Sequence, residues 1–147
     1  MLLRRSLANI LEDSIRELFL ARGHYLVAKN AYNIHRKTRG VNPLTLVSAL
    51  SGYPITYSTF GSLSMTAGDK RVKKTLLRIN KATAKIKREK PWIYHRIGNR
   101  LESITTSLNR VLTLDNIDEK IAFLENIIAE LKNLCNEVRV LEIGRRS

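Results

Sequence analysis

Basic side chains at helical spacing are the residues of this sequence best suited to chemistry, and that chemistry is anion binding. Positions 69–100 contain twelve Lys or Arg residues but only two acidic ones, Asp69 and Glu89. At about 1.5 Å per residue, a helix from Lys70 to Arg88 would carry a cationic row roughly 27 Å long. That length suits a run of phosphates better than one small ligand. Six basic residues recur every three or four positions and form this row: Lys70, Lys74, Arg78, Lys81, Lys85 and Arg88.

The same stretch carries an apolar face on its other side. Spacings of four, three, four and three residues separate its members, which is typical of one face of an α-helix. A lysine-rich helix face is often only solvated surface. Here acidic residues at i±4, which normally accompany solvated lysines, are almost absent, and this favours a bound polyanion. The apolar positions are Val72, Leu76, Ile79, Thr83 and Ile86.

The charge imbalance extends beyond this helix but not over the whole chain. The 147 residues carry a formal net charge of +13. Residues 18–101 contain 17 basic and 2 acidic residues, whereas the remainder has a net charge of −2. Such asymmetry implies a polyanionic partner, with nucleic acid the first expectation and an anionic membrane surface the second.

A long first helix is predicted in the segment 6–40, ending before Gly40. Its apolar face changes character partway along, and at the same helical phase it becomes Arg22, Tyr25, Lys29, Tyr32, Arg36 and Arg39. One interpretation is that the second half projects as a basic arm. The alternative is that Tyr25 and Tyr32 belong to the core while the basic groups extend around them.

The remaining segments complete an all-α prediction. Residues 41–68 carry no charge, and we expect a short helix over 43–51 and an ordered loop over 53–68. Asp69 is the expected cap of the basic helix, and Pro91 should kink it. A helix over 91–112 and, after an Asp115 cap, an antiparallel helix over 116–141 should follow. The fold class is a helical bundle or hairpin with a long projecting basic N-terminal helix, in one domain spanning 1–147 with parts 6–40, 41–68 and 69–147.

The candidate nucleic-acid contacts come from three of these segments. An aromatic and basic cluster around Trp92 and Arg96 adds to the helix over 69–90, although Trp92 could instead anchor the core at the bend. The predicted contacts are Arg22, Tyr25, Lys29, Tyr32, Arg36, Lys37, Arg39, Lys70, Lys74, Arg78, Lys81, Lys85, Arg88 and Arg96.

Motifs for catalysis or metal binding are missing from the sequence. His24, His35 and His95 lack an HExxH spacing, and no Walker, GxGxxG or GxSxG motif occurs. The basic half supplies too few carboxylates for a two-metal nuclease. We therefore expect a protein that is not an enzyme and needs no metal or cofactor. The single Cys135 cannot form an intramolecular disulfide and is expected to be a buried thiol. No signal peptide or membrane-spanning stretch is predicted, so an intracellular or virion location is expected.

In layout, the chain resembles the coat proteins of filamentous archaeal viruses. The resemblance covers the arm-like helix from Arg22 to Arg36, the Lys70–Arg88 helix and the Ile117–Leu141 helix, and it rests on no sequence motif. It implies basic α-helical capsid subunits, self-assembled or paired with a paralogous subunit, that encase A-form-like double-stranded DNA rather than RNA in a helical filament. Such a protein would be a virion component assembled in the host cytoplasm.

Two other functions remain open. Leu44–Gly52 followed by Ile55–Leu63 has the length of a helix-turn-helix unit of a transcriptional regulator. Its second helix, however, lacks the Arg, Lys, Asn or Gln that reach base edges. A small helical subunit of a ribonucleoprotein complex would share the basic faces without self-assembly.

Overall fold

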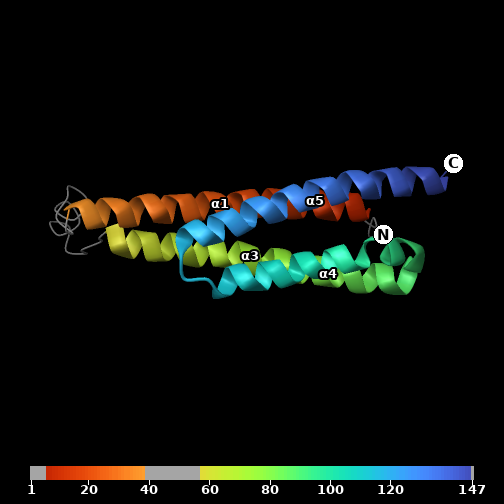
Figure 1. Ribbon diagram of the computed structural model, residues 1–147, viewed down its shortest axis with the longest axis horizontal. Coiled ribbons are helices and arrows are strands. Elements are labelled where there is room, and N and C mark those ends of the chain that lie inside the picture. Colours follow the sequence, from red (N-terminus) through yellow and green to blue (C-terminus); the bar gives the residue numbers. More distant parts are fainter. Residues whose placement is uncertain (1–5, 39–56, 147) are drawn as a thin grey trace, which may run out of the picture.

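The computed structural model describes residues 6–38 and 57–146, and these form an antiparallel bundle of four helices (Figure 1). The helices are α1 (Leu7–Thr38), α3 (Tyr57–Glu89), α4 (Pro91–Thr113) and α5 (Ile117–Arg146). Each runs opposite to the one before it. Helix α1 packs on α3 and α5, and α4 also packs on α3 and α5, so α3 and α5 lie diagonally across the bundle. The predicted all-α bundle is confirmed.

One apolar core runs between the four helices. Helices α4 and α5 contribute the regular three- and four-residue repeats that the sequence predicted, with Ile97, Leu101 and Leu131 fully buried. Leucine and isoleucine at this spacing form a stripe that must be removed from water, which is why the two helices pack antiparallel after a short turn. No helix within the described ranges combines the length and apolar character that a membrane crossing requires.

The first helix packs along α3 instead of forming a free arm. Tyr25 and Ala28 are fully buried, and Ala31 is nearly so, on the half that was expected to project. At one end of the bundle, α1 and the start of α3 extend past α4 and α5, but they do so as a pair (Figure 1). The interpretation of the second half as a lone basic arm is therefore wrong.

Small residues explain how α1 and α3 pack so closely. A Cβ atom added at Gly68 would lie 2.6 Å from the ring of Tyr25, and one at Gly61 would lie 2.9 Å from the ring of Tyr32. Both the tyrosines and the glycines are seven residues apart, about two helical turns. Each ring therefore lies against the backbone of the opposing helix, where any larger residue than glycine would collide with it.

Replacing Gly68 by alanine should destabilise the protein, because the new methyl group overlaps the buried Tyr25 ring. We expect a loss of about 1–3 kcal/mol in the free energy of unfolding, measured by urea denaturation. Gly23→Ala is the matched control, since nothing lies within 4 Å of its added Cβ. It should instead stabilise the helix by about 0.5–1 kcal/mol. Equal effects of the two substitutions would contradict this packing.

Two segment boundaries differ from the sequence prediction. The expected loop over 53–68 is helical from Tyr57 on, because residues 57–68 pack against α1, and Asp69 therefore lies inside α3 instead of capping it. At Pro91 the chain reverses completely instead of kinking, so α4 packs back on α3 (Figure 1). The expected short helix over 43–51 lies outside the described residues.

The turn before α5 also differs in detail. The side-chain oxygen of Asn116, not that of Asp115, accepts the hydrogen bond from the Glu119 backbone N–H at 3.1 Å. An Asn at this position satisfies one of the free N–H groups of a helix start.

A buried polar cluster joins all four helices. Lys120 of α5 is 2% exposed, and its Nζ donates to Asp69 of α3 at 3.1 Å and to the Val111 carbonyl of α4 at 2.8 Å. The Tyr25 hydroxyl of α1 donates to the same Asp69 carboxylate at 2.5 Å. Burial, reinforced by this hydrogen bond, raises the pKa of the Tyr25 phenol well above its ordinary value. The phenol therefore stays protonated and keeps donating.

Removing the carboxylate from this cluster should be costly. Asp69→Leu leaves the Lys120 ammonium buried without its counter-charge, and we expect a loss of about 3 kcal/mol in the free energy of unfolding. Urea denaturation at neutral pH measures it. Asp115→Leu, which removes an exposed carboxylate at the α4–α5 turn, should change stability by no more than about 0.5 kcal/mol. An unchanged unfolding midpoint for Asp69→Leu would mean that the cluster does not hold the helices together.

Candidate nucleic-acid interface

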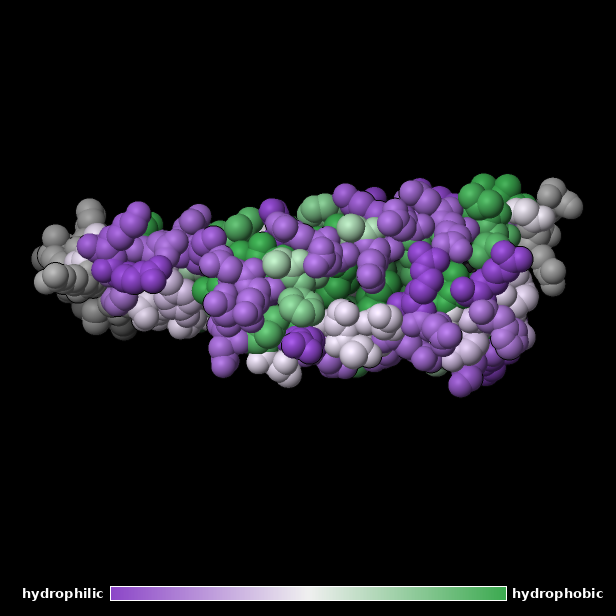
Figure 2. Space-filling view, viewed as in Figure 1, coloured by the Kyte–Doolittle hydropathy of each residue, from purple (hydrophilic) through white to green (hydrophobic). Residues whose placement is uncertain are grey.

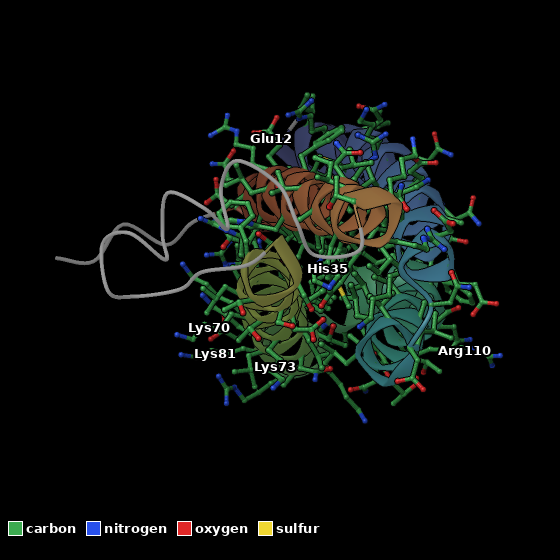
Figure 3. All side chains as sticks on the ribbon, turned by 90° about the vertical axis from the view of Figure 1, so that its left-hand side faces the viewer. Glu12, His35, Lys70, Lys73, Lys81 and Arg110 are labelled. Atoms are coloured by element: carbon green, nitrogen blue, oxygen red, sulfur yellow. The ribbon has the colours of Figure 1, made fainter. Side chains whose placement is uncertain are left out.

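The six predicted cations of α3 lie on the outer side of the bundle. We call this set the α3 ladder: Lys70, Lys74, Arg78, Lys81, Lys85 and Arg88. Lys70, Lys74, Lys81 and Arg88 are exposed, and the other two are half-buried. Viewed along the bundle, Lys70 and Lys81 point away from the other helices, whereas Arg110 of α4 lies on the opposite side (Figure 3).

The packing of α3 gives the ladder its direction. Val72, Ile79 and Ile86 are buried against the neighbouring helices, as the apolar spacing predicted. Thr83 is also buried, and its hydroxyl donates to the Ile79 carbonyl at 2.7 Å. Leu76 is only half-buried, and the turn before it places Thr75 fully inside the core. With this side of α3 fixed inward, a row offset from it by two residues, about 200° around the helix, must face water.

Most ladder cations have no acidic partner nearby. Glu17 of α1 pairs with Arg71 at 3.0 Å and lies 3.9 Å from Lys74, and Arg88 lies 3.8 Å from Glu89. Among the described residues, no ion pair reaches the remaining four ladder members. The longer contacts of the exposed Lys74 and Arg88 contribute at most about 1 kcal/mol each. The positive charge of α3, with nine basic and two acidic residues, is thus left largely uncompensated.

Tyr25, a predicted contact, is not available to a ligand. It is fully buried, because its ring occupies the space opposite Gly68 and its hydroxyl is held by Asp69. Tyr32 is half-buried, with its ring against Gly61 and its hydroxyl 3.0 Å from Ser62. The two tyrosines therefore position α1 on α3.

The cations of α1 lie on another side of the bundle from the ladder. Arg22 pairs with Glu125 of α5 at 2.9 Å, and Lys29 pairs with Asp118 of α5 at 2.7 Å. Arg22 and Lys29 therefore lie along the boundary between α1 and α5, where the carboxylates of α5 partly neutralise them. Arg36 and Lys37 are exposed at the end of α1, and Arg39 lies outside the described residues.

The cluster at the start of α4 is divided between structure and surface. Trp92 is partly buried against the core. The hydrogen bond from the Tyr94 hydroxyl to Glu102, at 2.8 Å, raises the pKa of that phenol. Arg96 is exposed, whereas Arg100 is paired with Glu137 of α5.

Three further cations on α3 or directly after it are exposed, although their spacing had not singled them out. Lys73, Lys87 and Lys90 are exposed, and Lys73 points outward beside Lys70 (Figure 3). The Lys87 ammonium lies 5.4 Å from the centre of the Tyr94 ring. Lys87 therefore lies toward α4, and Lys90 follows the last residue of α3, so neither belongs to the ladder row.

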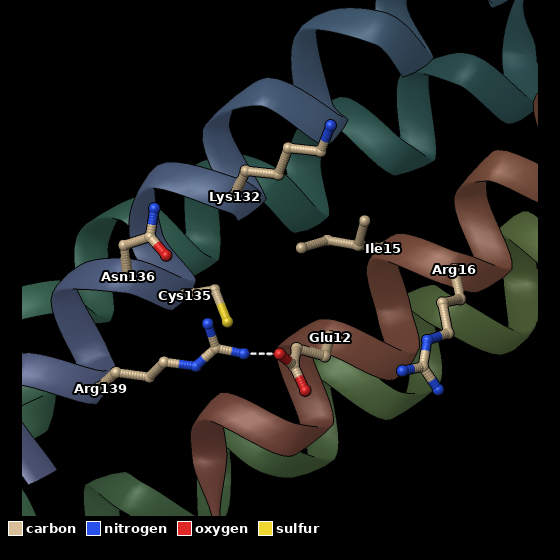
Figure 4. A pocket seen from close by; sticks show the side chains of 7 residues that line it. All are labelled: Glu12, Ile15, Arg16, Lys132, Cys135, Asn136 and Arg139. Carbon is tan, nitrogen blue, oxygen red and sulfur yellow. Dashed lines mark ion pairs between the residues drawn. The ribbon is translucent and has the colours of Figure 1, made fainter.

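Metal binding and thiol chemistry find little support among the residues that the structure describes. No group of three His, Cys, Asp or Glu side chains within residues 6–38 and 57–146 could hold a metal ion. A shallow groove between α1 and α5 is crossed by the ion pair of Arg139 and Glu12, and Ile15, Arg16 and Cys135 also line it (Figure 4). Burial raises the pKa of the Cys135 thiol, which disfavours the reactive thiolate.

Comparisons with known proteins add no family to this description. No family model, no curated protein and no solved structure matches the chain.

Proposed function

We propose that this protein is a structural nucleic-acid-binding protein that coats double-stranded DNA through sequence-independent phosphate contacts, as a virion coat subunit of a helical filament. The single observation that supports the proposal is the α3 ladder, six cations in one outward row of which four have no ion-pair partner among the described residues. In this proposal the protein is not an enzyme and needs no cofactor.

Spacing and residue type favour backbone contact over base reading. Neighbouring ladder residues on the helix surface lie about 5–6 Å apart, and B-DNA presents one phosphate charge for about every 1.7 Å of its axis. Several phosphates thus lie within reach of one straight helix. Four of the six ladder residues are lysines, which act as flexible point charges toward phosphate.

The packing of α1 changes how such a subunit would hold DNA. The resemblance to filament coat proteins implied a wrapping arm, but α1 is paired with α3 along its length. We therefore assign the contact to the side of a rigid bundle. Arg36 lines a hollow with Lys29 and Asp118 of α5, so it lies on the α1–α5 side and does not extend the ladder. Lys37 is exposed at the same end of α1, and Arg96 is exposed at the other end of the bundle.

The helix-turn-helix alternative loses its main support. Residues 57–63, which would belong to its second helix, form the first two turns of the 33-residue helix α3. A ribonucleoprotein subunit would use the same ladder, so the choice between DNA and RNA needs competition binding with the two duplexes.

Reversing charges in the ladder should abolish binding. For wild type, about six phosphate contacts predict that log K falls with log salt at a slope near −5. In Arg78→Glu with Lys81→Glu and Lys85→Glu, the ladder repels phosphate, and we expect no binding at moderate salt. Fluorescence anisotropy with random-sequence duplexes measures affinity, and circular dichroism should show unchanged helicity. Unaltered affinity in this variant would refute the ladder as the binding surface.

A matched pair of double variants separates a local contact from the effect of net charge. Lys81→Glu with Lys85→Glu and Arg16→Glu with Arg110→Glu change the charge equally, but only the first pair lies on the ladder. We expect a far larger loss of affinity for the first.

A specific sequence bound about 10³-fold more tightly than random DNA would instead favour a regulator. Electron microscopy with linear DNA should reveal filaments of uniform diameter.

A further inference from the structure

An open hollow lies where α1 and α3 pack together, on the side of the bundle where Figure 3 shows Lys70. Its volume is about 430 Å³, and sites that hold small ligands measure roughly 300–1,000 Å³. We call it the α1–α3 hollow. Its lining residues are Glu17 and His24 of α1 and Ala67, Lys70, Arg71 and Lys74 of α3.

Positive charge exceeds negative charge in this hollow. The lining contains three cations, Lys70, Arg71 and Lys74, and one carboxylate, that of Glu17. The Glu17 side chain is only 13% exposed and accepts a hydrogen bond from Arg71, so this carboxylate is largely withdrawn from water. Lys74 lies 3.9 Å from it, and Lys70 has no ion-pair partner in the part of the chain that the structure describes. The hollow therefore suits an anion.

The Arg71 guanidinium is held in one orientation by two residues of α1. Its Nε donates to Nε2 of His24 at 3.2 Å, and its Nη1 donates to Glu17 at 3.0 Å. Within residues 6–38 and 57–146, no hydrogen bond uses its other terminal nitrogen, Nη2. An arginine that is already immobilised loses less freedom on binding than a mobile lysine, and its planar N–H groups match the oxygens of a phosphate. Arg71 is thus the oriented donor of the hollow, and Glu17 and His24 are its positioning residues.

The small side chain of Ala67 leaves room for the anion. Ala67, Lys70, Arg71 and Lys74 follow one another at spacings within four residues and lie on one side of α3. Ala67 precedes Arg71 by one helical turn, so its methyl group borders the space beside the guanidinium. A longer side chain at this position would occupy that space.

The opposite face of the bundle offers a contrast. There α4 and α5 face the viewer, and hydrophobic groups reach the surface between hydrophilic side chains (Figure 2). A hollow between these helices is lined by one cation, Arg100, and one carboxylate, Glu130, and Arg100 is itself paired with Glu137. Its charges are balanced, whereas those of the α1–α3 hollow are not.

We propose that the α1–α3 hollow is a phosphate-binding site, in which Arg71 together with Lys70 and Lys74 holds one phosphate of the nucleic-acid backbone. Ladder lysines alone are mobile point charges, and such contacts let a protein slide along a polyanion. A phosphate held by an oriented guanidinium fixes the position of the subunit on the backbone. The inference rests on the proposed function for the source of the phosphate, but the site itself can be tested without nucleic acid.

Inorganic phosphate is the probe for the site. In an NMR titration of the full chain at about 0.15 M salt, the backbone amides of residues 67–74 should shift and saturate. Arg71→Lys keeps the charge but removes the planar donor group, and we expect affinity for phosphate to fall by about tenfold or more, as for a lost hydrogen bond to a charged group. Arg88→Lys is the matched control, because Arg88 is a ladder arginine outside the hollow, and it should leave the affinity unchanged.

Filling the hollow tests its shape without changing its charge. Ala67→Leu should abolish saturable phosphate binding, whereas Ala84→Leu, at an exposed position of α3 away from the hollow, should not. Leucine and alanine both favour helix, so circular dichroism should show equal helicity. Shifts that grow linearly with phosphate, or equal affinities of Arg71→Lys and Arg88→Lys, would overturn the site.

Duplex binding, measured by fluorescence anisotropy, tests the source of the phosphate. Arg71→Lys and Ala67→Leu should weaken it relative to their two controls. Phosphate binding with unchanged duplex affinity in these variants would overturn the backbone as the source and leave free phosphate as the ligand. Duplex binding by wild type without saturable phosphate binding would overturn the hollow and leave the coating function intact. Phosphate binding without any duplex binding would refute the coating function, so the two failures are distinguishable.

Discussion

The buried ammonium of Lys120 is the contact on which the arrangement of the bundle depends. A charge removed from water is tolerated only where it is paired and hydrogen-bonded, and here the partners come from the other three helices. Asp69 supplies the carboxylate, Val111 a carbonyl and Tyr25 a hydroxyl that shares the carboxylate. Apolar packing alone would let helices slide or rotate, whereas this set of partners can be satisfied in only one register.

That register determines which side of α3 faces water. Asp69 must point inward to meet Lys120, and Val72 and Ile79 on the same side are buried with it. Gly68 then lies against the Tyr25 ring. Once these contacts are made, Lys70 and the cations that follow it at helical spacing have no place except the outer surface. The basic row is therefore a consequence of the core as much as of its own sequence.

Charge is separated across the diagonal of the bundle. Helix α3 carries nine basic residues against two acidic ones, whereas α5 has five basic and six acidic residues. The acidic groups of α5 neutralise cations of α1 and α4, as the pairs of Arg22 with Glu125 and Arg100 with Glu137 illustrate. Among residues 6–38 and 57–146, none of them forms an ion pair with α3. This separation leaves the excess positive charge of the described residues on the α3 side of the bundle.

The sequence by itself determined the helices and the basic row. Apolar repeats placed α1, α4 and α5 within a few residues of their observed bounds, and they put the six ladder cations opposite Val72 and Ile79, because periodicity reports which side of a helix avoids water. Only the tertiary structure decided what each side meets. The packed bundle buries Tyr25 and Lys120 in its core and reverses the chain direction at Pro91. These outcomes depend on contacts between residues far apart in the chain, such as Tyr25 with Gly68, which local spacing does not encode.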